Sequence, residues 1–268
     1  MALPRLDHTF AKLRADKKAA FIAYVSAGDP SLSATLDIVL ALEVAGADIV
    51  ELGLPFSDPL ADGIVNQLAA QRALESGTTT SGVLKLVSQI RERSQIPLVL
   101  FAYLNPIYAY GFERFHKDAA AAGVDGILLL DLPPHEACLN QELTETHGLQ
   151  QIRLIAPTTP PERVHEIASQ ATGFIYYVSR EGVTGAQTNL AESIAENVSA
   201  IRASAVAPVC VGFGISTPEQ AATVAQCADG VVVGSAIVKI IATHGADDDL
   251  AQRVEDFVRP LVQAVKSV

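Results

Sequence analysis

The chain has 268 residues, of which 49% are hydrophobic and 18% are charged. This composition excludes a disordered chain and allows a large buried core. The 19 basic and 30 acidic residues give a net charge of −11, which argues against nonspecific binding to nucleic acid or to an anionic membrane.

Short apolar runs rich in β-branched residues recur along the whole chain, and each predicts a strand. They are nearly continuous in apolar character, as expected of strands buried on both faces. The eight predicted strands are Ala20–Val25, Ile49–Leu52, Leu98–Tyr103, Gly126–Leu130, Gln151–Ile155, Phe174–Val178, Val209–Gly212 and Gly230–Val233.

Segments with helical periodicity lie between these strands. The predicted helices are Leu32–Ala45, Thr80–Glu92, Gly111–Ala121, Pro160–Gln170, Ala191–Ala203, Thr217–Ala225 and Asp248–Lys266. Alternating strands and helices imply βαβ units and a parallel sheet. Eight strands indicate closure into a (β/α)8 TIM barrel, with an open doubly wound sheet as the alternative.

No linker or low-complexity tract divides the chain, so we expect residues 1–268 to form a single TIM-barrel domain. Single α/β barrels often run to about 250 residues, which leaves room for an extra N-terminal helix. Two connections are longer than a tight turn: Pro55–Ala70 after strand 2 and Arg180–Asn189 after strand 6. Long loops on a compact scaffold are commonly functional.

The N-terminal segment and the cysteines give information about the cellular compartment of the protein. The first 20 residues contain no long apolar segment, and no apolar run in the chain approaches about 20 residues. We therefore expect no secretory signal and no membrane span, and a cytoplasmic protein (or a stromal one, if this is a mature plastid chain). Cys138, Cys210 and Cys227 form no CxxC pair, which predicts buried reduced thiols rather than a zinc site or disulfides.

The second strand and its loop carry three carboxylates. In a TIM barrel the active site forms at the C-terminal ends of the strands. Glu51 lies inside an apolar strand, where a carboxylate is costly unless it is paired or takes part in chemistry. Asp58 and Asp62 follow in the loop, where an aspartate before Pro or Gly is usually a turn residue. Together, Glu51 and Asp62 could protonate one end of a substrate and deprotonate the other.

Glycine clusters follow the last two strands, at Gly212–Ser216 and Gly234–Ile237. Barrels frequently bind phosphate with these two loops and the N-terminus of a short helix. A tight turn is the alternative for each cluster alone, but their joint position favours a phosphate site. The sixth loop could add the Gly185 amide and serve as a lid.

Two other chemistries are disfavoured. A Schiff-base aldolase needs a lysine at a strand end, but all seven lysines fall in predicted helices or termini. A metal-dependent aldolase needs clustered ligands, but the six histidines are scattered, and we interpret them as solvated or helix-surface residues. We therefore expect metal-free chemistry that depends on carboxylates.

The segment 51–63, ELGLPFSDPLADG, closely resembles the signature of the tryptophan synthase alpha subunit family. The resemblance extends over almost the whole chain. The segments that carry it, in order, are Phe21–Tyr24, Ala27–Pro30, Tyr103–Pro106, Asp131–Pro133, Gly182–Gly185, Gly212–Ser216 and Gly234–Val238. One departure is Ile64, where many relatives have proline.

The resemblance implies a (β/α)8 barrel that cleaves indole-3-glycerol phosphate to indole and glyceraldehyde 3-phosphate. Glu51 matches the family's acid–base glutamate, and Asp62 matches the aspartate that accepts the indole N–H proton. The positions that match the indole pocket are Phe21, Tyr103, Leu130, Tyr176 and Phe213. The positions that match the phosphate site are Gly185, Gly214, Gly234 and Ser235. Asp58 and Thr184 match the pair through which the two mobile loops meet.

The resemblance also implies a partner. In the family, indole passes through a tunnel to a beta subunit that carries pyridoxal phosphate, in an α2β2 complex, so no cofactor is expected in this chain. A stand-alone lyase that releases free indole is an alternative. A noncatalytic barrel that binds a phosphorylated ligand would be expected to have lost Glu51 or Asp62. A sugar-phosphate isomerase would lack the 55–63 loop.

Overall fold

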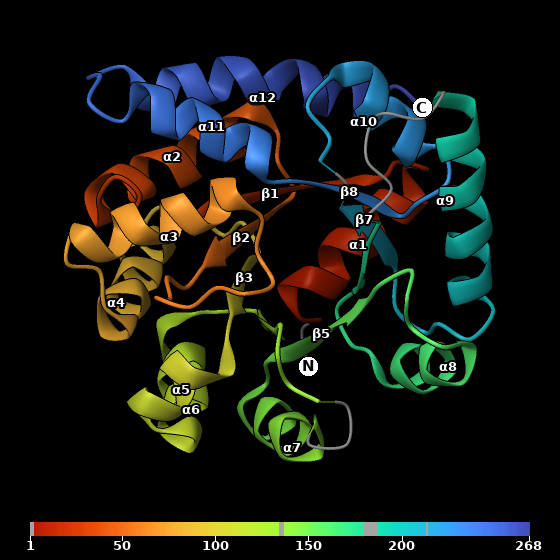
Figure 1. Ribbon diagram of the computed structural model, residues 1–268, viewed down its shortest axis with the longest axis horizontal. Coiled ribbons are helices and arrows are strands. Elements are labelled where there is room, and N and C mark those ends of the chain that lie inside the picture. Colours follow the sequence, from red (N-terminus) through yellow and green to blue (C-terminus); the bar gives the residue numbers. More distant parts are fainter. Residues whose placement is uncertain (1–2, 134–136, 180–186, 213) are drawn as a thin grey trace.

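The computed structural model describes residues 3–133, 137–179, 187–212 and 214–268, and for 187–193 the backbone alone. Eight parallel strands pair in chain order and close into a barrel, with the last strand beside the first (Figure 1). They are β1 (Ala20–Ser26), β2 (Ile49–Gly53), β3 (Leu98–Ala102), β4 (Gly126–Leu129), β5 (Gln150–Ile155), β6 (Ile175–Val178), β7 (Val209–Gly212) and β8 (Gly230–Val233). The TIM-barrel prediction is confirmed, and the open sheet is excluded.

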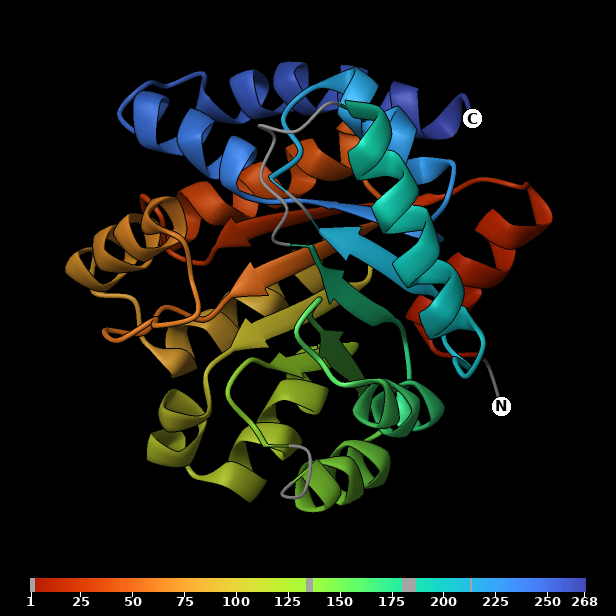
Figure 2. The same ribbon diagram turned by 45° about the vertical axis from the view of Figure 1, so that its right-hand side comes forward.

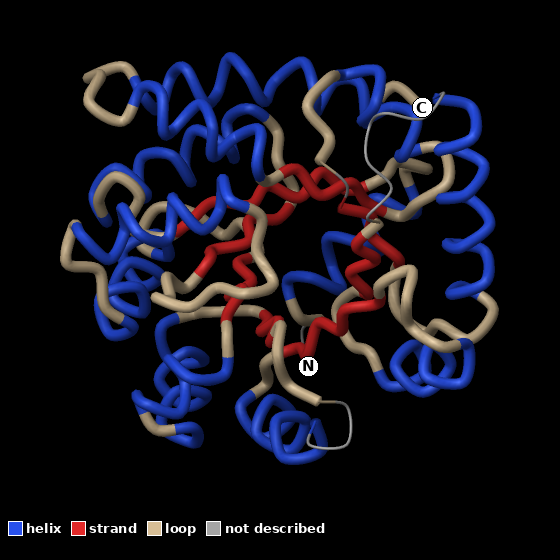
Figure 3. The backbone as a smooth tube through the Cα atoms, in the orientation of Figure 1, coloured by secondary structure: helices blue, strands red, loops and turns tan. Residues whose placement is uncertain are grey.

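Helices surround the ring of strands, as Figures 2 and 3 show. They are α1 (Arg5–Ala15), α2 (Leu32–Ala45), α3 (Ile64–Glu75), α4 (Thr80–Arg91), α5 (Leu104–Tyr110), α6 (Phe112–Ala122), α7 (Ala137–His147), α8 (Pro161–Gln170), α9 (Gln187–Arg202), α10 (Pro218–Ala225), α11 (Ser235–His244) and α12 (Leu250–Lys266). Capping residues fix several starts: the Ser31 hydroxyl accepts from the Ala34 amide at α2, and Thr217 and Gln220 form a capping box at α10.

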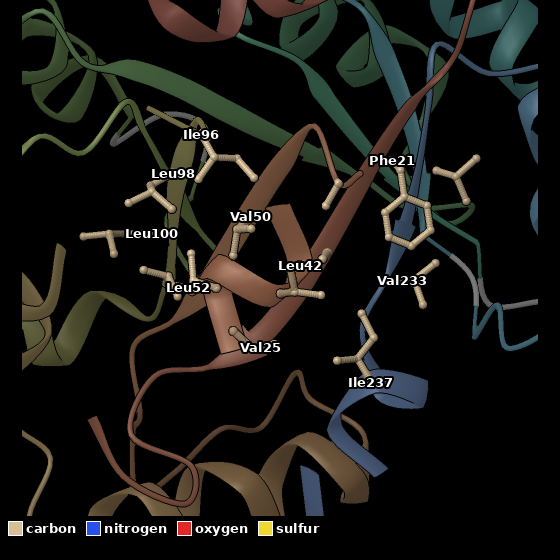
Figure 4. Close-up of a cluster of buried hydrophobic side chains, with 14 of the residues drawn as sticks. Phe21, Val25, Leu42, Val50, Leu52, Ile96, Leu98, Leu100, Val233 and Ile237 are labelled. Carbon is tan, nitrogen blue, oxygen red and sulfur yellow. The ribbon is translucent and has the colours of Figure 1, made fainter. Parts of the chain in front are cut away.

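Alternate strand residues face two different hydrophobic clusters. In β1, Phe21 and Val25 pack outward against the helices, in the cluster that also holds Leu42 of α2 and Ile237 of α11 (Figure 4). Ile22 and Tyr24 point into the barrel, with Val99, Phe101 and Phe174 among others. In β2 the outward pair is Val50 and Leu52, so Glu51 between them points inward.

The N-terminal end of the barrel is filled by α1, the predicted extra helix. Leu6, Phe10 and Leu13 on one face of α1 are buried with the inward strand residues. The Phe10 and Phe174 rings lie 6.0 Å apart between centroids. This packing leaves the opposite end of the barrel, where the strands finish, for a site.

Four helices differ from the prediction. The loop after β2 ends at Gly63 because α3 begins at Ile64, and α5, α7 and α11 were also not predicted. The buried face of α3 consists of Ala69, Ala70 and Ala73, which give little hydrophobic contrast in the sequence. Of the sixth loop, residues 180–186 lie outside the described residues, and α9 begins at Gln187.

Two expectations about single residues were wrong. His116, expected at a surface, is fully buried between α6 and α7, where its ring nitrogens contact the Phe112 carbonyl and Asn140 Oδ1 at 2.8 Å each. Of the cysteines, only Cys210 is buried, while Cys138 is exposed and Cys227 is partly exposed. No helix in the described part of the chain is long and apolar enough to cross a membrane.

Candidate active site

A cavity of about 580 Å³ opens at the C-terminal ends of the strands. Its wall combines aromatic and aliphatic side chains with the carboxylate of Asp62 and two glycine-rich turns. The lining residues include Tyr24, Asp62, Phe101, Leu130, Leu154, Tyr176, Gly214, Gly234 and Ser235. This is the end of the barrel at which TIM-barrel enzymes place their active sites.

Glu51 is a buried carboxyl group without a hydrogen-bond partner. The residue has 0% exposure, and neither carboxylate oxygen has a partner among the described residues. Burial raises the pKa of Glu51 to about 8, because an ionised carboxylate is poorly solvated there. At pH 7 this group therefore holds a proton most of the time, as a general acid must.

Asp62 is held in place by hydrogen bonds from Tyr103, which directly follows β3, and from Gln67 in α3. The Tyr103 hydroxyl donates a hydrogen bond to Asp62 Oδ2 at 2.9 Å and accepts one from the Ala61 amide at 2.9 Å. Gln67 Nε2 also donates to the Asp62 carbonyl at 2.9 Å. Burial raises the pKa of Asp62, and the hydrogen bonds from Tyr103 and Asn66 oppose that rise. The carboxylate is thus fixed at the cavity wall with its charged form partly stabilised.

Two tyrosines connect the carboxylates. Burial raises the pKa of Tyr24 and of Tyr176, and the negative charges of both Glu51 and Asp62 raise these pKa values further. Both tyrosines are therefore close enough to respond to both carboxylates. Tyr24 is the lateral neighbour of Glu51 across the β1–β2 pairing. The two acids consequently serve one region of the cavity.

The tyrosine rings require glycine beneath them. A side chain at Gly53 would collide with the Tyr24 ring, and one at Gly212 would collide with the Tyr176 ring. Phe101 meets Tyr24 edge-on, with 5.1 Å between ring centroids. These rings form an aromatic wall that suits an aromatic ligand.

The glycine-rich turns of the cavity wall offer backbone donors. Gly234 and Ser235 lie at the start of α11, and no side chain caps the amides of its first turn. Gly214 lies beside them after β7. Free amides and the positive end of the helix dipole favour an anion such as phosphate.

The predicted site residues are distributed unevenly over this structure. Asp62, Leu130, Tyr176, Gly214, Gly234 and Ser235 line the cavity. Glu51 is fully buried in β2, near the two lining tyrosines, and Tyr103 reaches the site through its hydroxyl. Asp58 is exposed and accepts a hydrogen bond from Ser57 Oγ at 2.5 Å. Phe213, Thr184 and Gly185 lie outside the described residues.

Phe21 needs correction. It is completely buried in the outward cluster between the barrel and its helices, so it does not line the cavity. Tyr24 and Phe101 supply the aromatic wall instead, and the sequence analysis missed both. The strand register contains the signal: Tyr24 pairs laterally with Glu51, so the two point to the same side, whereas Phe21 is three residues away and points to the other.

The described residues contain no group of three His, Cys, Asp or Glu side chains that could hold a metal ion. The groups that line the cavity are the Asp62 carboxyl group, aromatic surfaces and backbone amides, and the buried Glu51 carboxyl group lies near the lining tyrosines.

Comparisons with known proteins agree with this geometry. The sequence model of the family "Tryptophan synthase alpha chain" matches residues 10–266. Tryptophan synthase alpha chains of Geobacter sp. (strain M21) and Geobacter sulfurreducens are 52% and 50% identical over 264 and 263 residues, which is 98% of this chain and 98% and 99% of theirs.

Solved structures match as well. The crystal structure of tryptophan synthase subunit alpha from Legionella pneumophila has 40% identity and a TM-score of 0.91, and the match covers 100% of both chains. A tryptophan synthase structure from M. tuberculosis has 33% identity and a TM-score of 0.88, over 98% of this chain and 99% of that one. The chain belongs to the tryptophan synthase alpha chain family.

Proposed function

We propose that Glu51 and Asp62 carry out the reaction of this family, the cleavage of indole-3-glycerol phosphate to indole and glyceraldehyde 3-phosphate. The observation that carries the proposal is the unpartnered, buried Glu51, whose pKa of about 8 keeps it protonated at neutral pH. Asp62 provides a fixed carboxylate at the same cavity.

The chemistry needs both groups because an indole carbanion is a poor leaving group. Glu51 donates its proton to indole C3 while Asp62 removes the proton from indole N1, which gives the indolenine tautomer. The Glu51 carboxylate then removes the proton of the adjacent glycerol hydroxyl. The bond between C3 and the glycerol carbon breaks, its electrons return to the ring, and Asp62 returns the proton to N1. Both residues end in their starting protonation states.

The cavity walls support this orientation. The Tyr24, Phe101 and Tyr176 rings suit the indole, and the amides at Gly214 and at the start of α11 suit the phosphate. The cavity therefore offers one kind of surface to the indole and another to the phosphate.

A beta subunit is the partner that this proposal includes. Leu60 is 91% exposed in the loop after β2, and Ile64 and Leu68 in α3 are also exposed. Tyr108 in α5 adds a further exposed ring. We assign these apolar side chains to contact with a beta subunit that carries pyridoxal phosphate and receives the indole, in an α2β2 complex in the cytoplasm. The chain itself needs no cofactor for the steps above.

The test is indole formation from indole-3-glycerol phosphate by the purified chain, with and without a beta subunit. We expect activity that the beta subunit increases strongly, and a loss of at least about 100-fold in Asp62→Asn under both conditions. Full activity of the chain alone would favour the stand-alone lyase. Wild-type turnover in Asp62→Asn would contradict the proposed mechanism.

A further inference from the structure

Arg153 is a buried arginine that the proposed reaction does not use. It lies in β5 between the inward residues Ile152 and Leu154, so its side chain points outward from the barrel. Only 9% of the residue is exposed, yet Nε and Nη2 have no hydrogen-bond partner within the described part of the chain. A buried charge without a partner is expensive, so its presence calls for a ligand.

Two other arginines of the described chain, the mostly buried Arg91 and the partly exposed Arg72, have hydrogen-bond partners. Arg91 donates from Nε to the Gly123 carbonyl, from Nη1 to the Ile96 carbonyl and from Nη2 to Asp125, at 2.7–2.8 Å. Arg72 uses Nε and Nη2, the same two atoms that are free in Arg153, to hold both oxygens of Asp29 at 2.9 and 2.7 Å. The guanidinium edge that is free in Arg153 is therefore the same edge with which Arg72 binds the carboxylate of Asp29.

Arg153 faces a cavity of about 210 Å³ on the outer side of the barrel wall. The pairing of β4 with β5 ends at Leu128 and Ile152, next to residues that line the cavity. Arg163 at the start of α8 lies at the exposed rim, and Thr159 adds a hydroxyl. Buried Gln151 also lines the cavity, with an Oε1 that no described group contacts.

We propose that this cavity binds a small oxyanion, a carboxylate or a phosphate, through the Nε and Nη2 edge of Arg153. Two parallel N–H groups match two oxygens of either anion. Arg163 adds a second positive charge at the rim, and Gln151 Oε1 can accept from a hydroxyl of the ligand. The exposed Glu166 raises the pKa of Arg153 electrostatically, although burial lowers it more, and no ion pair is found between these two described residues.

The site is separate from the candidate active site. The two cavities have different linings apart from Leu130 and Leu154, which contribute to both. Binding at Arg153 is therefore independent of whether Glu51 and Asp62 cleave the proposed substrate.

The experiment is a nuclear magnetic resonance titration of the arginine Nε–H signals in the ¹⁵N-labelled full chain. Inorganic phosphate is added in one series and acetate in the other, at constant pH and ionic strength. The Arg153 signal is the one that is absent from the spectrum of Arg153→Met. We expect it to shift saturably with phosphate, with acetate or with both. The anion with the lower half-saturation concentration identifies the preferred class of ligand. The Arg91 signal is the internal control. It should not shift, because Arg91 Nε already donates a hydrogen bond to the Gly123 carbonyl.

Two further variants complete the experiment, one at Arg163 on the rim of the cavity and a second one at Arg153. Arg163→Met should raise the half-saturation concentration about two- to fivefold, as expected for one exposed charge. If Arg153→Met does not fold, Arg153→Lys supplies the assignment, since it also removes the Nε–H signal. An Arg153 signal that moves with neither anion overturns the proposal, as does one that moves only together with that of Arg91.

Discussion

The two ends of the barrel differ in how their carboxyl groups are bonded to neighbouring residues. At the N-terminal end, Asp48, Asp125 and Asp229 each pair with a basic side chain and accept a hydrogen bond from the first residues of a strand. The amide donors are Phe21, Leu98 and Val209, at 2.7–2.8 Å, and the basic partners are Lys266 for Asp48, Arg5 and Arg91 for Asp125, and Arg202 for Asp229. At the other end, Glu51 has no partner among the described residues.

The difference shows how partners decide what a carboxylate does. A carboxylate surrounded by donors joins strands to helices, so it contributes to stability. A carboxyl group buried without donors keeps its proton at neutral pH and can give it away. The absence of partners at Glu51 therefore distinguishes the candidate catalytic acid from the structural aspartates.

The largest effect should follow the replacement of Glu51. Glu51→Gln keeps the shape but removes the transferable proton, so we expect indole formation to fall by roughly 10²- to 10⁴-fold. Turnover of indole-3-glycerol phosphate by the complex measures it. The variant should unfold at no lower urea concentration than the wild type, because Gln has no charge to bury. Wild-type turnover would remove Glu51 from the mechanism.

The matching variant at the other end is Asp125→Asn. It removes the charge that pairs with buried Arg91, and breaking a buried pair costs about 3–5 kcal/mol. Urea denaturation should show that loss in the free energy of unfolding, while turnover of the folded protein stays near that of the wild type. Asp247→Asn, at a half-exposed ion pair with Arg253, is the control and should cost less than about 1 kcal/mol.

The pH dependence of stability should follow Glu51. Its pKa of about 8 in the folded chain lies above the ordinary 4.5, so between these values the folded state holds a proton that the unfolded state has lost. The free energy of unfolding should consequently fall as pH rises through this window, by up to ~1.4 kcal/mol per pH unit. Urea denaturation of wild type against Glu51→Gln isolates this contribution. Parallel pH profiles of the two proteins would show that Glu51 is not protonated in the fold.

The smallest effect concerns Tyr103. Tyr103→Phe removes the hydrogen bonds to Asp62 and the Ala61 amide, each worth about 0.5–1.5 kcal/mol. We expect kcat to fall by roughly 3- to 30-fold, with the acid limb of its pH profile displaced, because one bond that lowers the pKa of Asp62 is lost. An unchanged acid limb with a raised KM would make Tyr103 part of the substrate wall alone.

The sequence alone predicts the barrel well because buried parallel strands are nearly continuous apolar runs, such as Ile49–Leu52 and Gly230–Val233. It predicts poorly the helices that bury alanine, such as α3. The acidic pair was found because Glu51 interrupts an apolar strand. Phe21 was assigned to the indole pocket by resemblance, and the assignment was wrong. The apolar run around Phe21 does not tell which face points inward, whereas the register between β1 and β2 does.

The position of α1 determines from which end of the barrel a ligand can reach the cavity. Since Leu6, Phe10 and Leu13 fill the N-terminal end of the barrel, a ligand of the cavity would enter and leave through a shared mouth, formed among the described residues at the C-terminal ends of the strands. A partner seated on the exposed apolar residues Leu60 and Ile64 would stand at that shared passage. Its arrival and departure would then set both how fast substrate enters and where the product goes.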